Sequence, residues 1–254
     1  MTTSAIELRD VWKRFGKTEI VRGASLAVAP GERMAVIGPN GAGKTTLFNL
    51  MSGRQPFTSG DILLHGRSIR GLRAFEVSRR GLSRSFQISN LFHRLSVFEN
   101  LRCAALWALG YRYSFWRQVR GMSDANERAE RLMEMTGLTA RRDTPAGLLP
   151  YAEQRALEIG IAVSGDADVI LLDEPTAGMS RSESDAAVSL IRRLTAGKTL
   201  LMVEHDMGVV FGLADHVAVV VHGQVIACDA PDRVRANPLV QEAYLGAAAE
   251  EVAS

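Results

Sequence analysis

A glycine-rich stretch of this sequence has the residue types and spacing of a phosphate-binding loop. It matches the pattern G-x-x-x-x-G-K-[ST] at every fixed position. The glycines let the backbone curl so that several N–H groups converge on one phosphate. The lysine puts a cation at the β- and γ-phosphates, and the threonine hydroxyl can hold Mg²⁺. The candidate nucleotide-binding residues are Gly38, Pro39, Asn40, Gly41, Ala42, Gly43, Lys44, Thr45 and Thr46.

Two acids follow a second apolar stretch and add chemistry that the loop lacks. Residues 169–172 are apolar and lead to Asp173, a carboxylate that can hold the water shell of Mg²⁺ from the end of a strand. Glu174, one residue on, can orient and deprotonate an attacking water. Alone, an apolar strand ending in two acids is weak evidence. Beside a phosphate loop it predicts a second nucleotide-binding motif.

His205 ends a third apolar stretch, Thr199–His205. A lone histidine is usually structural or exposed, so its type alone argues little for function. Its predicted place at the carboxyl edge of a parallel sheet makes it a candidate, because ligands bind at that edge.

The elements that must position these residues alternate as in an α/β protein. Arg33–Ile37 reads as a buried strand and Thr45–Met51 as a helix whose N-terminus favours anions. Asp168–Glu174 and Thr199–His205 read as buried parallel strands. Further strands are expected at Ile6–Val11, Val21–Val28, Ser59–Gly66, Leu82–Phe86, Ala218–Val221 and Gln224–Ala227, the last two joined by a His222-Gly223 turn.

Between the two halves of this pattern, apolar residues recur at helical spacing. Helices are predicted at Val97–Leu109, at Asp124–Thr136 with Ser123 as N-cap, and at Glu153–Val163. A helical subdomain inserted into an α/β core is the simplest account. Further helices are expected at 182–195 and 238–245. Four aromatic residues in the insert favour packing within it, with docking of a partner as the alternative: Tyr111, Tyr113, Phe115 and Trp116.

Composition fits an ordinary globular chain. The 254 residues are enough for one large domain, and an apolar content of 46% supports a real core. The net charge of +2 is too small to argue for nucleic acid or membrane binding. Cys103 and Cys228 are too few for a disulfide framework or a zinc site, so reduced thiols are expected. The N-terminus does not read as a signal peptide, and no apolar run has the length of a membrane span.

The motifs together resemble the nucleotide-binding subunits of ABC transporters over nearly the full chain. The resemblance implies ATP and Mg²⁺ as cofactors, with Thr45, Gln87 and Asp173 at the metal. It implies that Phe15 stacks on adenine and that Gln87, in Ser85-Phe86-Gln87, couples the metal site to a membrane subunit. Glu174, His205 and Gln87 then carry the catalytic roles, with His205 contacting the γ-phosphate.

The same resemblance implies the ABC ATPase fold. This is an α/β P-loop NTPase (RecA-like) core with an N-terminal antiparallel β subdomain and an inserted α-helical subdomain. Residues 1–254 form one nucleotide-binding domain. Residues 1–87 and 166–245 make up the core, 88–165 the helical subdomain and 246–254 a flexible tail.

The chain is most similar to ATP-binding proteins of branched-chain amino acid importers. This implies import of those or related amino acids, with amides, urea and aromatic acids as alternatives. It also implies a second ATPase subunit, permease subunits, indirectly a solute-binding protein, and a place on the cytoplasmic face of the membrane. The segments that carry the similarity are Phe86-Gln87 with Leu91-Phe92, Val97–Leu101, Tyr151 with Gln154–Ile159, Pro175–Met179, Glu204–Met207, Asn237-Pro238 and Ala243–Gly246.

One segment departs from the family. The family's signature, Leu-Ser-Gly-Gly-Gln or Leu-Ser-Tyr-Gly-Gln, heads a helix that points at ATP held by the other subunit. Here it reads Leu149, Pro150, Tyr151, Ala152 and Glu153, which removes the serine hydroxyl and one backbone N–H and adds a negative charge.

The neighbouring D-loop, Gly178, Met179 and Ser180, has serine where many relatives have Asp or Asn. A strong nucleotide site with a weak signature predicts a heterodimer in which a partner's signature completes one competent site. The alternative is that Pro150 is tolerated and backbone donors at the helix N-terminus still grip the phosphate.

Two other classes compete with a transport motor. A soluble ABC ATPase for translation would usually carry two cassettes, and one for DNA repair a long coiled coil. Neither is present. A P-loop kinase or GTPase is disfavoured by Gln87, His205 and the helical insert. None of the four lysines, Lys13, Lys17, Lys44 and Lys198, sits in an Asn-Lys-x-Asp guanine motif.

Overall fold

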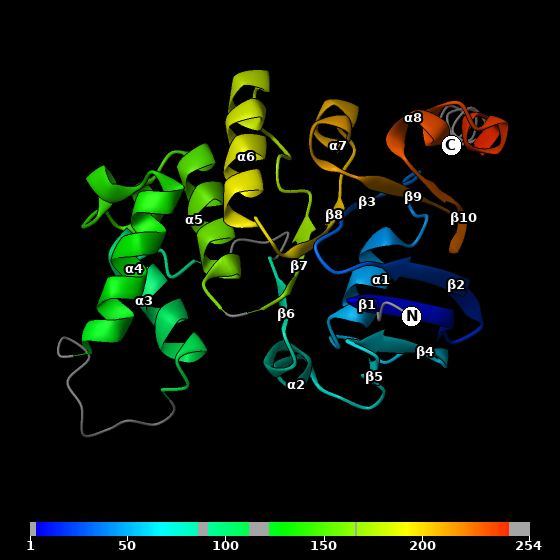
Figure 1. Cartoon of the computed structure of the whole chain (residues 1–254), viewed down its shortest axis with the longest axis horizontal. Coiled ribbons are helices and arrows are strands. Elements are labelled where there is room, and N and C mark those ends of the chain that lie inside the picture. Colours follow the sequence, from blue (N-terminus) through cyan, green and yellow to red (C-terminus); the bar gives the residue numbers. More distant parts are fainter. Residues whose placement is uncertain (1–3, 86–90, 112–121, 166, 244–254) are drawn as a thin grey trace.

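The computed structural model describes residues 4–85, 91–111, 122–165 and 167–243 (Figure 1). Its strands are β1 (Ile6–Phe15), β2 (Thr18–Val28), β3 (Arg33–Ile37), β4 (Ser59–Leu64), β5 (Arg67–Ser68), β6 (Leu82–Arg84), β7 (Val169–Asp173), β8 (Thr199–Val203), β9 (His216–Val221) and β10 (Gln224–Asp229). Its helices are α1 (Lys44–Met51), α2 (Ala74–Arg79), α3 (Val97–Ala108), α4 (Ser123–Thr136), α5 (Tyr151–Val163), α6 (Arg181–Leu194), α7 (Met207–Leu213) and α8 (Pro231–Arg235).

Six strands form a mainly parallel sheet in the order β10-β9-β3-β8-β7-β6. Strand β3 runs parallel to β8 and β9, and β7 runs parallel to β8 and β6. The antiparallel pair β9–β10 turns at His222-Gly223, as the sequence predicts. Because the central strands are parallel, the segments that follow β3, β7 and β8 all emerge at one edge of the sheet.

A second, antiparallel sheet has the order β2-β1-β4-β5. Helix α1 packs between this sheet and the parallel one, with Phe48 fully buried in their shared core. The expected combination of an α/β core with an N-terminal antiparallel sheet is therefore observed.

The central strands are buried on both faces, which explains their nearly continuous apolar sequence. Alternate residues enter different cores. Met34, Val36, Leu171 and Val203 face the core shared with α1 and the antiparallel sheet. The other face is packed against the helices and is lined by Ala35, Ile37, Ile170, Leu172, Leu200 and Met202.

Helices α3, α4 and α5 lie together at one end of the molecule (Figure 1). Their apolar residues Leu101, Met133 and Leu157 are buried in the same core as the helical face of the parallel sheet. Tyr111 packs against a small cluster around Ala105, and its hydroxyl donates to Asp124, 2.6 Å away. For this residue the structure shows the predicted packing within the insert. The other three predicted aromatics lie outside the described residues.

Several predicted boundaries are wrong by a few residues. Ser123 is the first residue of α4 and Met122 is its N-cap, without a side-chain cap. Helix α5 starts at Tyr151 rather than Glu153, because Pro150 is already set in a capping conformation. Strand β8 ends at Val203, so His205 follows it. The short helices α2, α7 and α8 were not predicted, since five to seven residues give too little periodicity to recognise.

Candidate functional site

The phosphate loop connects β3 to α1, as its sequence requires. Gly38 and Gly43 have φ of 153° and 99°. A Cβ at Gly38 would overlap the carbonyl oxygen of Val220, and a Cβ at Gly43 would lie 2.9 Å from that of Ile20. These positions therefore admit only glycine without rearrangement. Thr45, the second residue of α1, is exposed.

Lys44 is the first residue of α1 and is 6% exposed. Its ammonium donates to the carbonyl oxygens of Gly38 and Pro39 at 2.7 and 2.8 Å, so the side chain folds back over the loop. Burial lowers the pKa of Lys44, and the nearby carboxylates of Glu174 and Asp173 oppose that shift. The ammonium is thus bonded to the loop carbonyls and is near enough to the two predicted acids for their charges to act on it.

Asp173 ends β7 and is 1% exposed. Its Oδ2 accepts a hydrogen bond from Arg84 Nη2 at 2.8 Å, while its Oδ1 is buried and has no hydrogen-bond partner among the described residues. Burial lowers the pKa of Arg84, and the bond and charge of Asp173 oppose the shift. Arg84 was not predicted as a site residue, although a charged residue inside the expected strand Leu82–Phe86 was a signal.

Glu174 follows β7 in a left-handed conformation, with φ of 47°. Its backbone N–H donates to Val203 O at 3.0 Å, which keeps the turn against the end of β8. His205 Nε2 lies 3.1 Å from Glu174 Oε1. The tautomer protonated at Nε2 donates to this carboxylate. The structure thus brings the predicted base and the predicted histidine together.

Glu204 is a buried carboxylate, 3% exposed, that sequence reasoning used only as part of a family segment. Its Oε1 accepts from the backbone N–H and the hydroxyl of Thr176 at 3.1 and 2.8 Å. Its Oε2 accepts from the backbone N–H of His205 at 3.1 Å. Glu204 therefore ties the turn after β7 to the turn that carries His205.

Phe15, the last residue of β1, is 47% exposed. Lys13 Nζ lies 4.6 Å from the centroid of its ring. An exposed aromatic face of this kind suits stacking on a base. Gln87, the other predicted residue of this group, lies outside the described residues.

The signature segment forms the start of α5. Leu149 is buried and Pro150 is the N-cap. The hydroxyl of Tyr151 donates to Ala177 O at 2.9 Å, which joins α5 to the segment after β7.

Glu153 occupies the first turn of α5 and Ala152 precedes it. Arg141 Nε and Nη2 donate to the two oxygens of Glu153 at 2.9 and 3.2 Å. The negative charge that Glu153 adds to the segment is therefore paired with a guanidinium, a partner that the sequence did not indicate.

The D-loop leads into α6. Gly178 has φ of 77° and Met179 N–H donates to Thr176 O at 3.2 Å. Ser180 is the N-cap of α6, and both its backbone N–H and its hydroxyl donate to Glu183. These bonds lower the pKa of Glu183. Serine at this position is thus used to start the helix.

The donor set fits Mg²⁺. One buried carboxylate oxygen of Asp173 accepts no hydrogen bond from the residues that the structure describes, and an exposed threonine hydroxyl is available at Thr45. Magnesium usually takes one or two carboxylates together with substrate phosphates and waters. Among the residues that the structure describes, no group of three or more His, Cys, Asp or Glu could hold a metal ion by itself.

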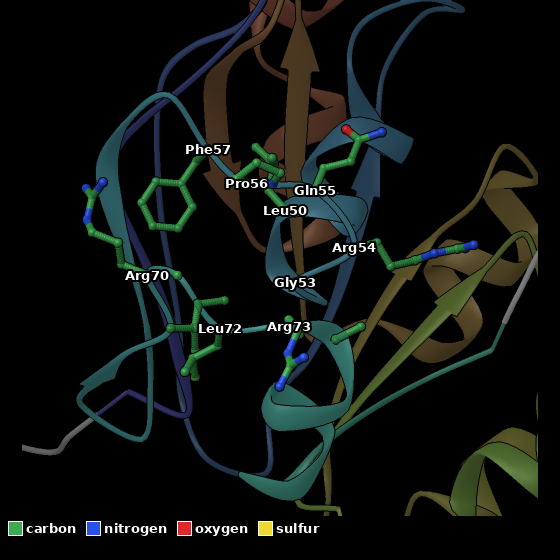
Figure 2. Close-up of a pocket in the computed structure, with 12 residues that line it drawn as sticks. Leu50, Gly53, Arg54, Gln55, Pro56, Phe57, Arg70, Leu72 and Arg73 are labelled. Atoms are coloured by element: carbon green, nitrogen blue, oxygen red, sulfur yellow. The ribbon is translucent and has the colours of Figure 1, made fainter.

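A cavity of about 710 Å³ lies beyond the far end of α1. Figure 2 shows Arg70 beside Phe57 at its rim, with the guanidinium 4.6 Å from the ring centroid. None of the predicted site residues lines this cavity, so it is separate from the phosphate loop. Within the described part of the chain, no helix is long and apolar enough to cross a membrane. Cys103 and Cys228 are free thiols.

Two protein-family models match the chain. A model described as ABC transporter matches residues 21–177, and one described as branched-chain amino acid ATP-binding cassette transporter matches residues 224–250. The first match includes both nucleotide-binding motifs and the helical insert, and it spans more than half of the chain.

Named relatives are similar over nearly the whole length. The high-affinity branched-chain amino acid transport ATP-binding protein BraF of Pseudomonas aeruginosa is 36% identical, over 98% of this chain and 100% of the relative. LivG of Escherichia coli, with the same description, is 35% identical over the same shares. A probable LivG of Archaeoglobus fulgidus is 31% identical over 97% of each chain.

Solved structures agree. A nucleotide-free ATP-binding cassette from an ABC transporter superposes with a TM-score of 0.83 at 25% identity, covering 95% of this chain and 98% of the other. A cassette in its ADP conformation gives a TM-score of 0.84 at 27% identity, covering 96% and 100%. The fold predicted from the motifs is confirmed by these likenesses.

Proposed function

The chain belongs to the ABC transporter ATP-binding family, and from this premise we propose which residues do the work and what the subunit drives. It is an ATP-hydrolysing motor subunit of an ABC importer. The relatives act in branched-chain amino acid transport, and we assign the same class of cargo to this chain. Amides, urea and aromatic acids remain the alternatives, to be separated by transport assays on the assembled importer.

The phosphate loop would bind ATP. Lys44 would leave the loop carbonyls and neutralise the β- and γ-phosphates, and the α1 N-terminus would add backbone donors. Phe15 would stack on adenine. When bound, Mg²⁺ supplies charge neutralisation at the phosphates. Thr45 and Asp173 would hold it, with Gln87 as the third residue assigned to the metal.

Glu174 and His205 would carry out ATP hydrolysis. The observation that carries this assignment is the 3.1 Å contact between His205 Nε2 and Glu174 Oε1, beside the phosphate loop. Glu174 would orient and deprotonate the attacking water, and His205 would hold that carboxylate and reach the γ-phosphate. The remaining acceleration comes from positioning and from Lys44.

Substitution of Glu174 by glutamine tests the assignment. The change keeps the size and the contact to His205 but removes the base. We expect ATP hydrolysis to fall by about 10²-fold or more while ATP binding is kept, and ATP-bound dimers to accumulate. Hydrolysis is followed by phosphate release and dimers by light scattering. Unchanged hydrolysis in Glu174→Gln would remove Glu174 from the mechanism.

Dimerisation would complete the site. We propose that the segment Leu149, Pro150, Tyr151, Ala152 and Glu153 faces ATP held by a second ATPase subunit, with Gly178, Met179 and Ser180 at the same interface. The lost serine hydroxyl supports a heterodimer with an intact partner signature. Comparing this chain alone with a reconstituted pair tests it, since full activity of the homodimer would exclude the asymmetry.

Further partners follow from the same proposal. The subunit would attach to permease subunits at the cytoplasmic face of the plasma membrane, and a solute-binding protein would act through them. Residues 1–87 and 166–245 would form the core that binds ATP. Residues 88–165 would form the helical unit that transmits its motion, with 246–254 as a tail. Co-purification with permease subunits tests the attachment.

A further inference from the structure

We propose that Arg84 is a positioning residue for the metal site, holding one oxygen of Asp173 so that the other is presented to Mg²⁺ and its water shell. The inference rests on the assignment of Asp173 to magnesium in the proposed function. Arg84 belongs to neither nucleotide-binding motif.

The guanidinium of Arg84 joins three elements. From the end of β6, Nη2 donates to Asp173 Oδ2 at the end of β7, 2.8 Å away. Nη1 donates to Asn49 Oδ1 at 2.8 Å and to Ser52 Oγ at 3.0 Å, at the C-terminal end of α1. The two terminal nitrogens, which form the fork of the guanidinium, therefore donate to β7 and to α1 at the same time. The single nitrogen of a lysine cannot do this with the same geometry.

The burial of both side chains makes the ion pair between Arg84 and Asp173 important for stability. The side chains of Arg84 and Asp173 are 5% and 0% exposed, so water cannot compensate either charge. Removing one partner of a buried ion pair leaves the other charge unpaired and is strongly destabilising. Lys44, another cation near Asp173, is hydrogen-bonded to loop carbonyls. Arg84 is thus the guanidinium that allows a buried carboxylate to stand at the end of β7.

The hydrogen bonds also fix the direction of the carboxylate. With Oδ2 held by Arg84, Oδ1 remains buried and has no partner within the described parts of the chain. An unpaired buried acceptor is costly and calls for a function. When magnesium is bound, a water of its shell would donate to Oδ1 while Arg84 keeps Oδ2. Neither oxygen of the carboxylate would then be left without a partner. Outer partners of metal-holding side chains act in this way, setting orientation without touching the metal.

The test measures nucleotide affinity rather than turnover. Binding of mant-ADP is titrated with Mg²⁺ and again with EDTA, for the wild-type chain, Arg84→Met, Arg84→Lys and Asp173→Asn. We expect Arg84→Met to lose about tenfold or more of the magnesium-dependent gain in affinity, with the affinity in EDTA unchanged. Arg84→Lys is expected to recover only part of the gain, because it keeps the charge and loses the fork.

The possible outcomes distinguish a wrong assignment of Asp173 from a wrong role for Arg84. If Asp173→Asn keeps the full magnesium gain, the assignment of Asp173 itself is wrong. If Asp173→Asn loses the gain but Arg84→Met keeps or increases it, Arg84 does not position Asp173 and this inference alone is overturned. Full recovery by Arg84→Lys would likewise reject a role for the fork.

Folding is checked by a double-mutant cycle on thermal stability. If Arg84→Met fails to fold, Arg84→Lys and the double variant Arg84→Met with Asp173→Asn carry the test. The ion pair predicts that Asp173→Asn relieves part of the destabilisation caused by Arg84→Met. Additive effects in the cycle would overturn the pairing on which the inference is built.

Discussion

Glu174 depends on a backbone conformation that non-glycine residues seldom adopt. Its φ of 47° turns the chain sharply after β7, and its N–H bond to Val203 keeps that turn against β8. Left-handed conformations of such residues cost free energy and persist where surrounding contacts enforce them. Here those contacts bring the Glu174 carboxylate to His205, so the strain serves the geometry of the site.

Glu204 holds the turn after β7 and the turn that carries His205 together through its hydrogen bonds. We expect Glu204→Ala to lower the free energy of unfolding by about 1–3 kcal/mol, because three donors from Thr176 and His205 lose their buried acceptor. Hydrolysis should fall as well, since the turn bearing His205 loses its anchor. Urea denaturation and phosphate release measure the two effects.

Glu204→Gln is the matched control, since its amide oxygen can still accept from Thr176. It should lose less stability than Glu204→Ala. A Glu204→Ala variant as stable as the wild-type chain would show that water replaces the carboxylate.

Among the helices, α5 is the one in which the altered signature places a negative residue, Glu153, in the first turn. A carboxylate at a helix N-terminus is favoured by the helix dipole. Pro150 supplies the fixed φ of the N-cap but no side-chain acceptor for the first backbone donors. Glu153 is paired with Arg141 from the turn that precedes the segment, so the face that would meet a partner's ATP is not left with a bare anion.

This pairing predicts a charge effect on dimerisation. Arg141→Ala should raise the ATP concentration for half-maximal dimerisation about two- to fivefold, the range expected when a solvent-accessible ion pair is lost. The freed Glu153 would then repel the triphosphate. Analytical ultracentrifugation in the Glu174→Gln background, in which bound ATP is expected to persist, measures the shift.

Glu153→Gln restores the residue that the family carries and removes the repulsion. Combined with Arg141→Ala, it should return the wild-type concentration dependence. If the double variant stays as weak as Arg141→Ala, the arginine acts by a route other than shielding Glu153.

In the whole molecule, the parallel sheet is packed on both faces, and the predicted site residues gather at one of its edges. The phosphate loop, the acids after β7 and the histidine after β8 come from distant parts of the chain and share that edge because β3, β8 and β7 are neighbours. Figure 1 shows the helices α3–α5 set at the end of this sheet, beyond β7 and β6.

Nucleotide binding should stabilise this whole unit by mass action. With Mg²⁺ and ATP at about 100 times the dissociation constant, the free energy of unfolding should rise by about 2.7 kcal/mol, because only the folded chain presents the loop. Thermal unfolding of the Glu174→Gln chain with and without Mg²⁺ and ATP measures the shift. Lys44→Ala, which lacks the loop cation, should show much less stabilisation.

The matched comparison is Arg193→Ala, an exposed change on α6 away from the loop. It should gain the same stabilisation as its parent. Equal stabilisation of Lys44→Ala would mean that ATP binds elsewhere on the molecule.

Contiguous residues were enough to predict the phosphate loop, the strand ending in Asp173 and the order of the longer helices and strands. Such features depend on contiguous residues, whose backbone geometry and burial follow from local spacing. The hairpin at His222-Gly223 was predicted for the same reason. Short helices were missed because they hold too few turns.

Which side chains meet was visible only in the folded chain. Arg84 and Asp173 are 89 positions apart, and Glu174 and His205 are 31 apart, so no spacing rule links them. Glu153 and Arg141 are 12 apart, yet sequence reasoning left Glu153 unpaired. Partner choice depends on which strands are neighbours and how turns direct their side chains. Chain order does not encode those distances, because they are set by the packing of the sheet between its two cores.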